Sequence, residues 1–400
     1  MKHESNDYVI RVLNSPDQVN ADDWNELLSL QSQATPFMRH EYLAALHSSG
    51  CATSNTGWTP RFILLELNGV LVGACALYLK PHSHGEYVFD QAWANAYAQH
   101  GLDYYPKAVV AVPFTPVPGA RLLARTSQDR FVLAKALIQW CDAEQLSSLH
   151  MLFSGIDDLQ ACEQAGMMLR HTVQFHWTNS EPGFLDFAAF LATLNLEKRK
   201  KIRQERRKVT DAGVTFRWSL GSAIAPSDWD FFYRCYERTY LEHGNAPYLS
   251  RDFFRSMAHT MPENWLLFIA ERFGRPIATS LIAVDAHKKS ATGLNDLQEK
   301  VAYGRYWGAL ERVDCLHFEA CYYQPLQWCI EHGYQRFEGG AQGEHKMARA
   351  LLPIKTSSAH WLAHPAFSDA IERYLEREDQ GIGAYLDDLV RRSPLKNPSI

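Results

Sequence analysis

Apolar residues in the first half of the chain occur in strand-length runs separated by turns and amphipathic stretches. The segment RFILLELNGVLVGACALYLK, residues 61–80, predicts two apolar strands joined around Asn68-Gly69, which is a strong hairpin signal. The other elements predicted in this half are two helices within 22–48 that break at Thr35-Pro36, a helix over about 128–145, a strand at 149–153, a helix over 156–165 and a closing strand at 170–178.

The second half repeats this order of elements. Two strands joined at Phe273-Gly274 are predicted in WLLFIAERFGRPIATSLIAVDA, residues 265–286. Around them the pattern predicts helices near 227–242 and 251–261, a strand at 301–310, a helix at 320–334, a strand at 335–340, a loop at 341–356, a strand at 358–362 and an amphipathic helix from about 366 to 388. Hairpins mixed with helical crossovers favour α/β domains with mixed, α+β-like sheets, and two unrelated α/β domains are the alternative to a repeat.

Length and composition indicate a folded protein of more than one domain. A chain of 400 residues is too long for one ordinary core, and 46% hydrophobic with 21% charged residues is typical of a soluble globular protein. We expect an N-terminal lobe over 1–180, a basic helix or connector over 181–212, a C-terminal lobe over 213–390 and a polar tail over 391–400. The net charge of -5 argues against a DNA-binding protein, so any site for a polyanion must be local.

The sequence contains no recognisable targeting or membrane segment. The N-terminus MKHESNDYVIRVLNS has no apolar core and no small-residue cleavage pattern, and no apolar run approaches the roughly 20 residues that cross a bilayer. The eight cysteines are dispersed without a CxxC pair, which favours reduced, buried thiols over disulfides or a zinc site. We therefore expect a cytoplasmic protein without a transmembrane segment, and the oligomeric state does not follow from the pattern.

A strongly basic helix is predicted at residues 198–208. Apolar residues are sparse there, chiefly Ile202 and Val209 on one face, so much of its circumference should carry positive charge. Such a helix concentrates a phosphate-rich ligand, for example a carrier diphosphate, coenzyme A or a tRNA acceptor end, unless it is only a solvated connector between lobes. Eight of its residues are basic, and the phosphate contacts we expect are Lys198, Arg199 and Arg203.

A strand that ends in acid-Gly-Gly is predicted at Glu338, and a polar loop follows it. Glycines at a strand end let the backbone approach a ligand closely. A carboxylate at such a position can act as a general base, and a nearby imidazole, ammonium group or backbone N–H can stabilise a developing oxyanion. The candidate catalytic residues are Glu338 or Glu344 as the base and His345 as an oxyanion donor, with Lys346, Arg349 and backbone N–H groups as further contacts. As an alternative, Glu338 pairs with Arg349 or Lys346 and only fixes the loop.

A third group of candidates lies at Leu316-His317-Phe318-Glu319. If this segment is extended, His317 and Glu319 point to the same side. They could then contact the acceptor, form local hydrogen bonds or, with Glu344 and His345, bind zinc or manganese, although this spacing does not diagnose a metal site. We expect no metal.

Aromatic clusters with basic neighbours complete the candidate site residues. On the predicted strand at 301–310, alternation would place Tyr303, Arg305 and Trp307 on a face that lines a cleft and Tyr306 on the core face. Core packing is the alternative for these aromatic residues. Lys107, which follows Tyr104-Tyr105, could meet an anionic group of a substrate.

Two long blocks of the sequence resemble the FemAB-like family of peptidoglycan biosynthesis or recognition proteins. The first contains GEYVFD, WANAY, GLDYYPK and AVPFTPVPGARLL within 85–123, and the second contains YGRYWG, LHFEACYYQPLQWCIEHG and FEGGAQGEHKMARALLPIKTSSAHW within 303–361. The resemblance extends from about Pro36 to Glu378. It implies the GNAT superfamily, with tandem GNAT-like (acyl-CoA N-acyltransferase) domains, and acyl or aminoacyl transfer.

The wider Fem-type transferases, which add amino acids from aminoacyl-tRNA to cell-wall precursors, are similar more loosely. EKRKKIRQERRKVTDAGV and RFEGG occupy the places of their basic helix and acid-Gly-Gly strand end. An inserted coiled-coil arm, which some Fem-type ligases carry, is missing from the sequence. The usual GNAT coenzyme A loop is also not cleanly present, which weakens acetyl-CoA as the donor.

The expected function is therefore N-acyl or aminoacyl transfer to an amine, with a peptidoglycan precursor or peptide as acceptor. Acyl-CoA or aminoacyl-tRNA would be the co-substrate, and no tightly bound cofactor is expected. We expect the C-terminal lobe to be catalytic, a bond-forming cleft between the lobes and direct attack without a covalent intermediate. The alternatives are a non-catalytic protein that recognises a cell-wall precursor or peptide, and a scaffold. Motifs of serine hydrolases, P-loop proteins, dinucleotide-binding proteins and HExxH metalloproteases are not in the sequence.

Overall fold

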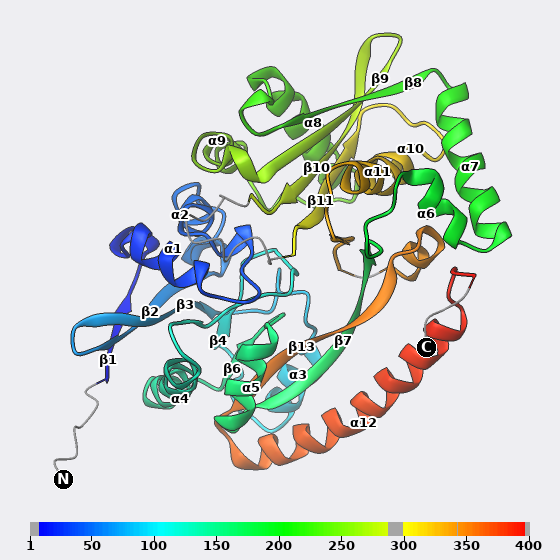
Figure 1. Ribbon diagram of the computed structural model, residues 1–400. Coiled ribbons are helices and arrows are strands. Elements are labelled where there is room, and N and C mark those ends of the chain that lie inside the picture. The colour runs from blue at the N-terminus through cyan, green and yellow to red at the C-terminus, as the bar shows by residue number, and fades with distance from the viewer. Residues whose placement is uncertain (1–7, 287–298, 342, 397–400) are drawn as a thin grey trace. The chain divides into compact units, whose positions relative to one another are not determined.

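The computed structural model describes residues 8–286, 299–341 and 343–396 (Figure 1). The chain divides into two compact units, Met1–Thr172 with Lys355–Ala384 and Val173–Ile354 with Tyr385–Ile400. The linear boundaries expected from the sequence differ from this division, because the segment 355–384 returns to the first unit. Gln342, in the loop after Glu338, and residues 397–400 of the expected polar tail lie outside the described ranges.

The first unit is built on a mixed sheet. Its strands follow the order β1 (Tyr8–Leu13), β2 (Thr59–Leu67), β3 (Val70–Lys80), β4 (Lys107–Val110), β6 (Ser148–Met151) and β13 (Leu352–Leu362), and β5 (Leu123–Ala124) pairs with β3. Among the strand pairs described within this sheet, β4 and β6 pair in parallel and the others are antiparallel. The helices are α1 (Ala21–Ser29), α2 (His40–Ser48), α3 (Gln91–Gln99), α4 (Ser127–Ala143), α5 (Ile156–Gln164) and most of α12 (Pro365–Arg391). A core of α4 residues such as Leu133 and Leu137 against Leu77, Val110 and Leu149 holds the sheet.

The second unit has a sheet in the order β7 (Met168–Thr178), β12 (Arg336–Glu338), β11 (Val301–Ala309), β10 (Arg275–Val284), β9 (Trp265–Arg272) and β8 (Val214–Leu220). Its helices are α6 (Phe187–Thr193), α7 (Leu196–Asp211), α8 (Pro226–Glu242), α9 (Arg251–Thr260), α10 (Leu316–Phe318) and α11 (Gln324–Glu331), with a π-helix at Glu319–Tyr323 and a 3-10 helix at Glu344–Arg349. Core residues of α6 and α11 pack against Phe268, Ala302 and Phe337 on one face of the sheet, and α8 and α9 contact Tyr306 on the other.

Both predicted hairpins are confirmed. Asn68 and Gly69 have φ values of 53° and 78°, and Phe273 and Gly274 have 52° and 74°, so each turn uses the left-handed region that two-residue hairpins need. The predicted helices of 128–145, 156–165, 227–242 and 251–261 correspond to α4, α5, α8 and α9. The turn residues of both hairpins can therefore be recognised in the local sequence.

Strand β13 begins at Leu352, inside the segment that the sequence predicts as a loop. Its inward positions include Thr356, Ser358 and His360, which are buried and polar. Hydrogen bonds replace apolar contacts there, because Thr356 pairs with Thr172 and Ser358 pairs with His360. A polar strand of this kind lacks the apolar run by which strands are recognised.

The cysteine expectation agrees with the structure, in which all eight cysteines are free and six of them are buried. Within the described ranges, no helix combines the length and the apolar character needed to cross a bilayer.

Candidate active site

Glu338 ends β12 between two partner strands. The pairing aligns Tyr303 of β11 with Glu338, and Glu338 with His176 of β7. Directly paired residues present their side chains on the same face, so these three groups lie together. The Glu338 carboxylate is buried, accepts a hydrogen bond from Arg336 Nε at 3.2 Å and lies 3.7 Å from His176 Nδ1. Its other oxygen, Oε2, has no hydrogen-bond partner among the described residues.

Burial sets the protonation of this group. It raises the pKa of Glu338 to about 7, although the Arg336 charge acts in the opposite direction. Burial, with the charges of Arg336 and Lys346, lowers the pKa of His176 to about 3, so this imidazole is neutral at neutral pH. The carboxylate thus has one charged partner and one neutral neighbour.

A second acid, Asp285, lies at the end of β10 next to this group. Tyr303 donates a hydrogen bond to Asp285 Oδ1 at 3.3 Å, and Val301 N donates to Oδ2 at 3.1 Å. Burial, and to a lesser degree the charge of Glu338, raises the pKa of Asp285 to about 8. Two carboxyl groups that hold protons near neutral pH are therefore neighbours. Asp285 is not among the residues predicted from the sequence, and its position directly after the apolar run of β10 is the signal that could have identified it.

Parallel pairing between β11 and β12 covers only three residues, Val301–Tyr303 with Arg336–Glu338. Beyond them β12 ends at Gly339 and Gly340, whereas β11 continues to Ala309 and, in the part of the chain that the structure describes, pairs there with β10 alone. A Cβ on Gly339 would lie 2.5 Å from Leu351 Cδ2, so a glycine allows the chain to turn away at this point. The edge of β11 past Tyr303 leaves backbone groups for a ligand.

The 3-10 helix after Glu338 brings Lys346 and His345 to this region. Lys346 Nζ donates to the carbonyl oxygens of Gly340 and Ala341 at 3.0 and 3.1 Å, and burial lowers its pKa to about 8. Burial also lowers the pKa of His345, whose Nε2 lies 3.3 Å from the Tyr322 hydroxyl. Lys346 therefore fixes the loop through backbone oxygens and leaves Glu338 to Arg336.

The two candidate glutamates differ sharply. Glu344 is about 43% exposed and pairs with Arg392, whereas Glu338 is buried. Arg349, the other expected partner of Glu338, pairs instead with Glu205 of α7. The structure therefore distinguishes Glu338 from Glu344 as the buried candidate, which the sequence alone could not do.

Helix α7 is anchored more firmly than its sequence suggests. Its buried residues are Ile202, Glu205 and Val209, and the Glu205 carboxylate accepts hydrogen bonds from Tyr323 and, at 3.2 Å, from Arg349. Arg206 also donates to Glu319 at 3.1 Å. These bonds hold α7 to the π-helix and to the 3-10 helix that carries His345 and Lys346.

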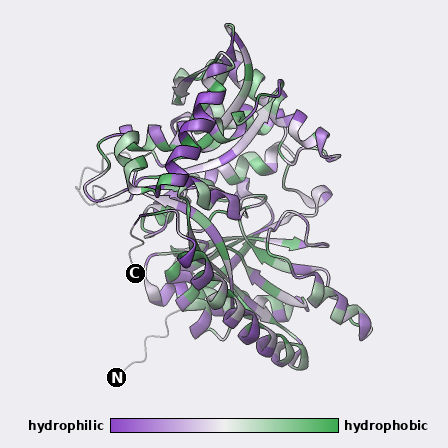
Figure 2. Ribbon diagram, turned by 90° about the vertical axis from the view of Figure 1, so that its right-hand side faces the viewer, coloured by the Kyte–Doolittle hydropathy of each residue, from purple (hydrophilic) through white to green (hydrophobic). Residues whose placement is uncertain are grey.

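The outer face of α7 is cationic. Lys200, Lys201, Arg203 and Arg207 are exposed, and none of them forms an ion pair within the described ranges. Lys198 is partly buried and pairs with Glu197 at 3.4 Å. The view of Figure 2 faces the side on which Figure 1 shows α7, and this helix is predominantly hydrophilic there. Charge without internal partners is available to an anionic ligand.

Residues 15–397 match the model of the FemAB-like family, whose description is peptidoglycan biosynthesis/recognition. The chain belongs to the FemAB-like family. The sequence matches no curated protein.

Solved structures share the fold of this FemAB-like protein at low identity. FemX matches with a TM-score of 0.53 at 10% identity, over 90% of this chain and 100% of FemX. L-PGS from Bacillus licheniformis matches with a TM-score of 0.53 at 11% identity, over 90% of this chain and 98% of its own. A protein of unknown function from Bacteroides thetaiotaomicron matches with a TM-score of 0.52 at 10% identity, over 88% and 100% of the two chains. The fold is α/β with mixed sheets, as expected, and it is the fold of FemX and L-PGS.

Two sequence expectations about this site need correction. Residues 316–323 are helical, so His317 and Glu319 do not share the side of an extended segment. His317 packs against the rings of Trp307 and Tyr322, and Glu319 is bound by Arg206. No group of three His, Cys, Asp or Glu residues suited to a metal ion occurs in the described ranges.

The second correction concerns the faces of β11. The pairing with β10 shifts at Arg305, because Gly304 pairs with Ile282 and Tyr306 with the adjacent Leu281. This bulge adds one residue and reverses the alternation beyond it. Tyr303 and Tyr306 therefore share a face, and Trp307 lies on the opposite one.

Lys107 does not present a free amine. It is buried in the first unit, donates a hydrogen bond to Glu86 at 2.7 Å and forms an ion pair with Asp90. Ser83 accepts a third bond at 2.8 Å. All three ammonium protons have acceptors inside the protein, so the anionic partners of Lys107 are its own carboxylates.

Proposed function

We propose that this FemAB-like protein transfers an acyl or aminoacyl group to an amine and that Glu338 is the general base. The observation that supports this most is the buried carboxylate at the end of β12, with an oxygen that has no partner in the described chain and a pKa raised to about 7. A base of this pKa is partly ionised at neutral pH and can accept the proton of an attacking ammonium group.

The proposed step is a direct displacement. Glu338 takes a proton from the acceptor ammonium, the amine attacks the carbonyl carbon of the donor, and a C–N bond forms. The bond to the leaving sulfur or ribose oxygen then breaks, and the leaving group takes up the proton that the attacking nitrogen releases. Backbone N–H groups of β11 beyond Tyr303, together with His345, are the groups we assign to the developing oxyanion.

A covalent enzyme intermediate is not part of this proposal. In the second unit Cys235 and Cys329 are buried, and desolvation raises the pKa of Cys321 to about 12. A thiol with so high a pKa is a poor nucleophile at neutral pH. Direct attack of the acceptor amine requires no such group.

The donor we propose carries phosphate groups, as acyl-CoA and aminoacyl-tRNA both do. The support is the exposed cationic face of α7, which includes Lys200, Lys201 and Arg203. The acceptor we propose is a peptidoglycan precursor or peptide, in keeping with the description of the family.

The test compares two glutamate variants with a matched chemical change. Purified protein would be assayed with acyl-CoAs or aminoacyl-tRNAs as donors and a muramyl pentapeptide as acceptor. We expect E338Q to lose about 10²–10⁴-fold in kcat with its acceptor affinity retained, which is the usual contribution of a general base, and E344Q to retain activity. Loss of activity in E344Q but not in E338Q would refute the assignment. Peptide binding with no turnover by any donor would favour the recognition protein.

A further inference from the structure

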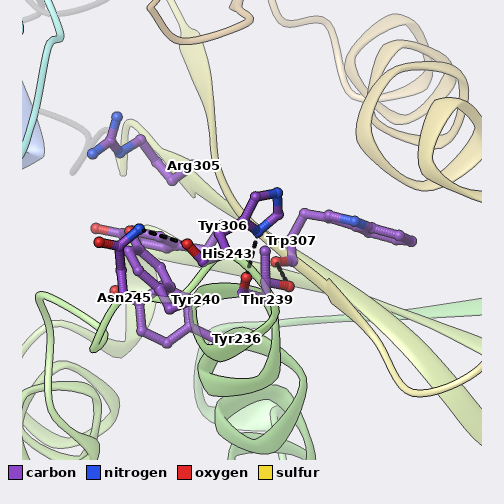
Figure 3. Close-up of a pocket in the computed structure, with 8 residues that line it drawn as sticks. All are labelled: Tyr236, Thr239, Tyr240, His243, Asn245, Arg305, Tyr306 and Trp307. Carbon is purple, nitrogen blue, oxygen red and sulfur yellow. Dashed lines mark hydrogen bonds between the residues drawn. The ribbon is translucent and has the colours of Figure 1, made fainter.

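The second unit contains a pocket of about 460 Å³ between the C-terminal part of α8 and strand β11 (Figure 3). We call it the Arg305 pocket. Its lining residues are Tyr236, Thr239, Tyr240, His243, Asn245, Arg305, Tyr306 and Trp307. In Figure 3 the tyrosines form one wall, and the Trp307 ring points away from them.

Close packing of α8 on β11 gives this pocket a fixed frame. A Cβ on Gly308 would lie only 2.0 Å from the carbonyl oxygen of Cys235, so the helix approaches the strand more closely than any other residue would permit. The Thr239 hydroxyl donates to the Trp307 carbonyl at 3.1 Å. Residues 236, 239, 240 and 243 then fall on one helix face and point to the strand.

The charge of the pocket comes from Arg305. The bulge of β11 adds this residue to the strand, and its guanidinium lies 5.3 Å from the Tyr306 ring centroid. Among the eight lining residues, all of them described, Arg305 is the one lysine or arginine, and there is no aspartate or glutamate. The lining therefore favours an anionic group over a cationic one.

Polar groups on the wall can orient such a ligand. The Tyr306 hydroxyl is buried and has no hydrogen-bond partner among the described residues. His243 Nδ1 lies 2.6 Å from the Thr239 carbonyl oxygen, which can only accept, so Nδ1 donates this bond and holds the ring in place at the wall. A buried hydroxyl without a partner is costly unless a ligand supplies one.

We propose that the Arg305 pocket binds a carboxylate of the peptide acceptor, with Arg305 and the Tyr306 hydroxyl as its donors. The inference rests on the proposed function, because it assigns the carboxylate to that acceptor. A planar guanidinium matches a carboxylate in a two-point contact, and the tyrosine faces suit the apolar parts of a peptide. A phosphate-rich ligand needs more than one positive charge, and the exposed cationic face described above lies on α7, outside this pocket.

Calorimetry with a peptide that has one carboxylate tests this. The probe is Nα-acetyl-Lys-D-Ala-D-Ala, compared with its C-terminal amide and with UDP-N-acetylglucosamine as a phosphate source. We expect the acid to bind wild type, and the amide, or the acid with R305Q, to bind at least about ten-fold more weakly. R275Q is the control, since Arg275 is 76% exposed on β10 and outside the pocket, and it should bind like wild type.

Equal binding of acid and amide, no binding of the acid, or an Arg305 dependence seen only with the sugar nucleotide would overturn the proposal. E338Q should bind the acid as wild type does. If E338Q loses turnover while wild type fails to bind the acid, the proposal for the Arg305 pocket is refuted and the proposed function stands. Y306F supplies a second test. It removes a hydroxyl without a described partner, so the free protein should keep its Tm while affinity for the acid falls about three- to ten-fold. A lower Tm with unchanged affinity would contradict the role of Tyr306.

Discussion

Burial raises the pKa of Glu338, and it also raises the pKa of the neighbouring Asp285. Glu344 lies six residues further along the chain, is about 43% exposed and pairs with Arg392. The same side chain therefore behaves differently at two positions of one loop region, because one carboxylate is removed from water and the other is not. Chemistry at this site depends on where the strand ends.

The raised pKa of Glu338 also affects stability. The unfolded chain releases this proton near the usual value of 4.5, whereas the folded protein keeps it up to about 7. The folded state binds more protons between these values, so this residue makes stability fall as pH rises from about 4.5 to 7. Gln at this position cannot titrate. We predict that E338Q has a higher Tm than wild type above pH 7. The gain in the free energy of unfolding should be on the order of 3 kcal/mol at most, and both differences should vanish below about pH 4.5. A difference independent of pH in thermal unfolding would contradict this.

Lys107 allows a prediction of the opposite kind. Removing its charge leaves Glu86 and Asp90 buried without their common partner. We predict that K107M lowers the free energy of unfolding by about 3–5 kcal/mol, measured by urea denaturation. Lys135 on α4 is exposed, and K135M should change stability by no more than about 0.5 kcal/mol. Similar stability of the two variants would show that Lys107 does not hold the two acids.

At the scale of residues, the sequence predicted which residue types belong to the site better than it predicted their hydrogen-bond and ion-pair partners. Glu338 and Lys346 were predicted because an acid, an amine and glycines near a strand end suit acyl transfer, and Arg305 because alternation along its strand would place it on a face that lines a cleft. Asp285 and Glu205 were missed, since their partners come from segments distant in the chain. A single sequence gives no measure of which charges will be paired after folding.

At the scale of elements, regular patterns were predictable and irregular ones were not. Hairpins and amphipathic helices follow from local periodicity, which a sequence displays directly. The bulge at Arg305 and the π-helix at Glu319–Tyr323 depend on neighbouring strands and helices. Both lie beside the proposed site, where departures from regular geometry direct side chains to new faces.

We expect the exposed side chains of α7 to bind the donor through their charge and to contribute little to the stability of the protein. We predict that the triple variant K200Q/K201Q/R203Q keeps the wild-type Tm but binds aminoacyl-tRNA or acyl-CoA more weakly, with a smaller dependence of affinity on salt. The control K135Q/R373Q/R377Q removes three exposed charges from the first unit. Fluorescence titrations at 50 and 200 mM salt, roughly the range over which such contacts weaken, would compare them. Equal loss of affinity in both triple variants would point to net charge and not to α7.

At the scale of the whole chain, the internal repeat predicted two α/β units but not how the chain passes between them. Residues 355–384 return to the first unit after the second is nearly complete. Strand β13 pairs with β6 there, with Ala359 opposite Met151 and Leu362 opposite Ser148. The strand predicted at 358–362 is the end of β13, but no local pattern shows that it pairs with β6, and residues 352–356 resemble a loop until their partners are known.

The discontinuous first unit leads to a prediction about fragments. A fragment of residues 1–180 follows the boundary expected from the sequence but lacks β13 and α12. It would lose Ile371 and Leu375, which pack with Trp93 and Tyr97. It would also lose His360, whose Nδ1 lies 2.7 Å from that of the buried His150. We expect this fragment to show no cooperative thermal unfolding, since it exposes core surface and leaves buried polar groups unpaired.

Joining residues 355–384 to the end of 1–172 through a flexible Gly/Ser linker should restore cooperative unfolding, because the linker closes the chain at a modest cost in entropy. The matched control carries L362D, I371D and L375D, which keep the length but place charges among the residues that pack with Trp93. It should remain unfolded by circular dichroism. Cooperative unfolding of 1–180 alone, at the temperature of the joined fragment, would show that the first unit is complete without the returning segment.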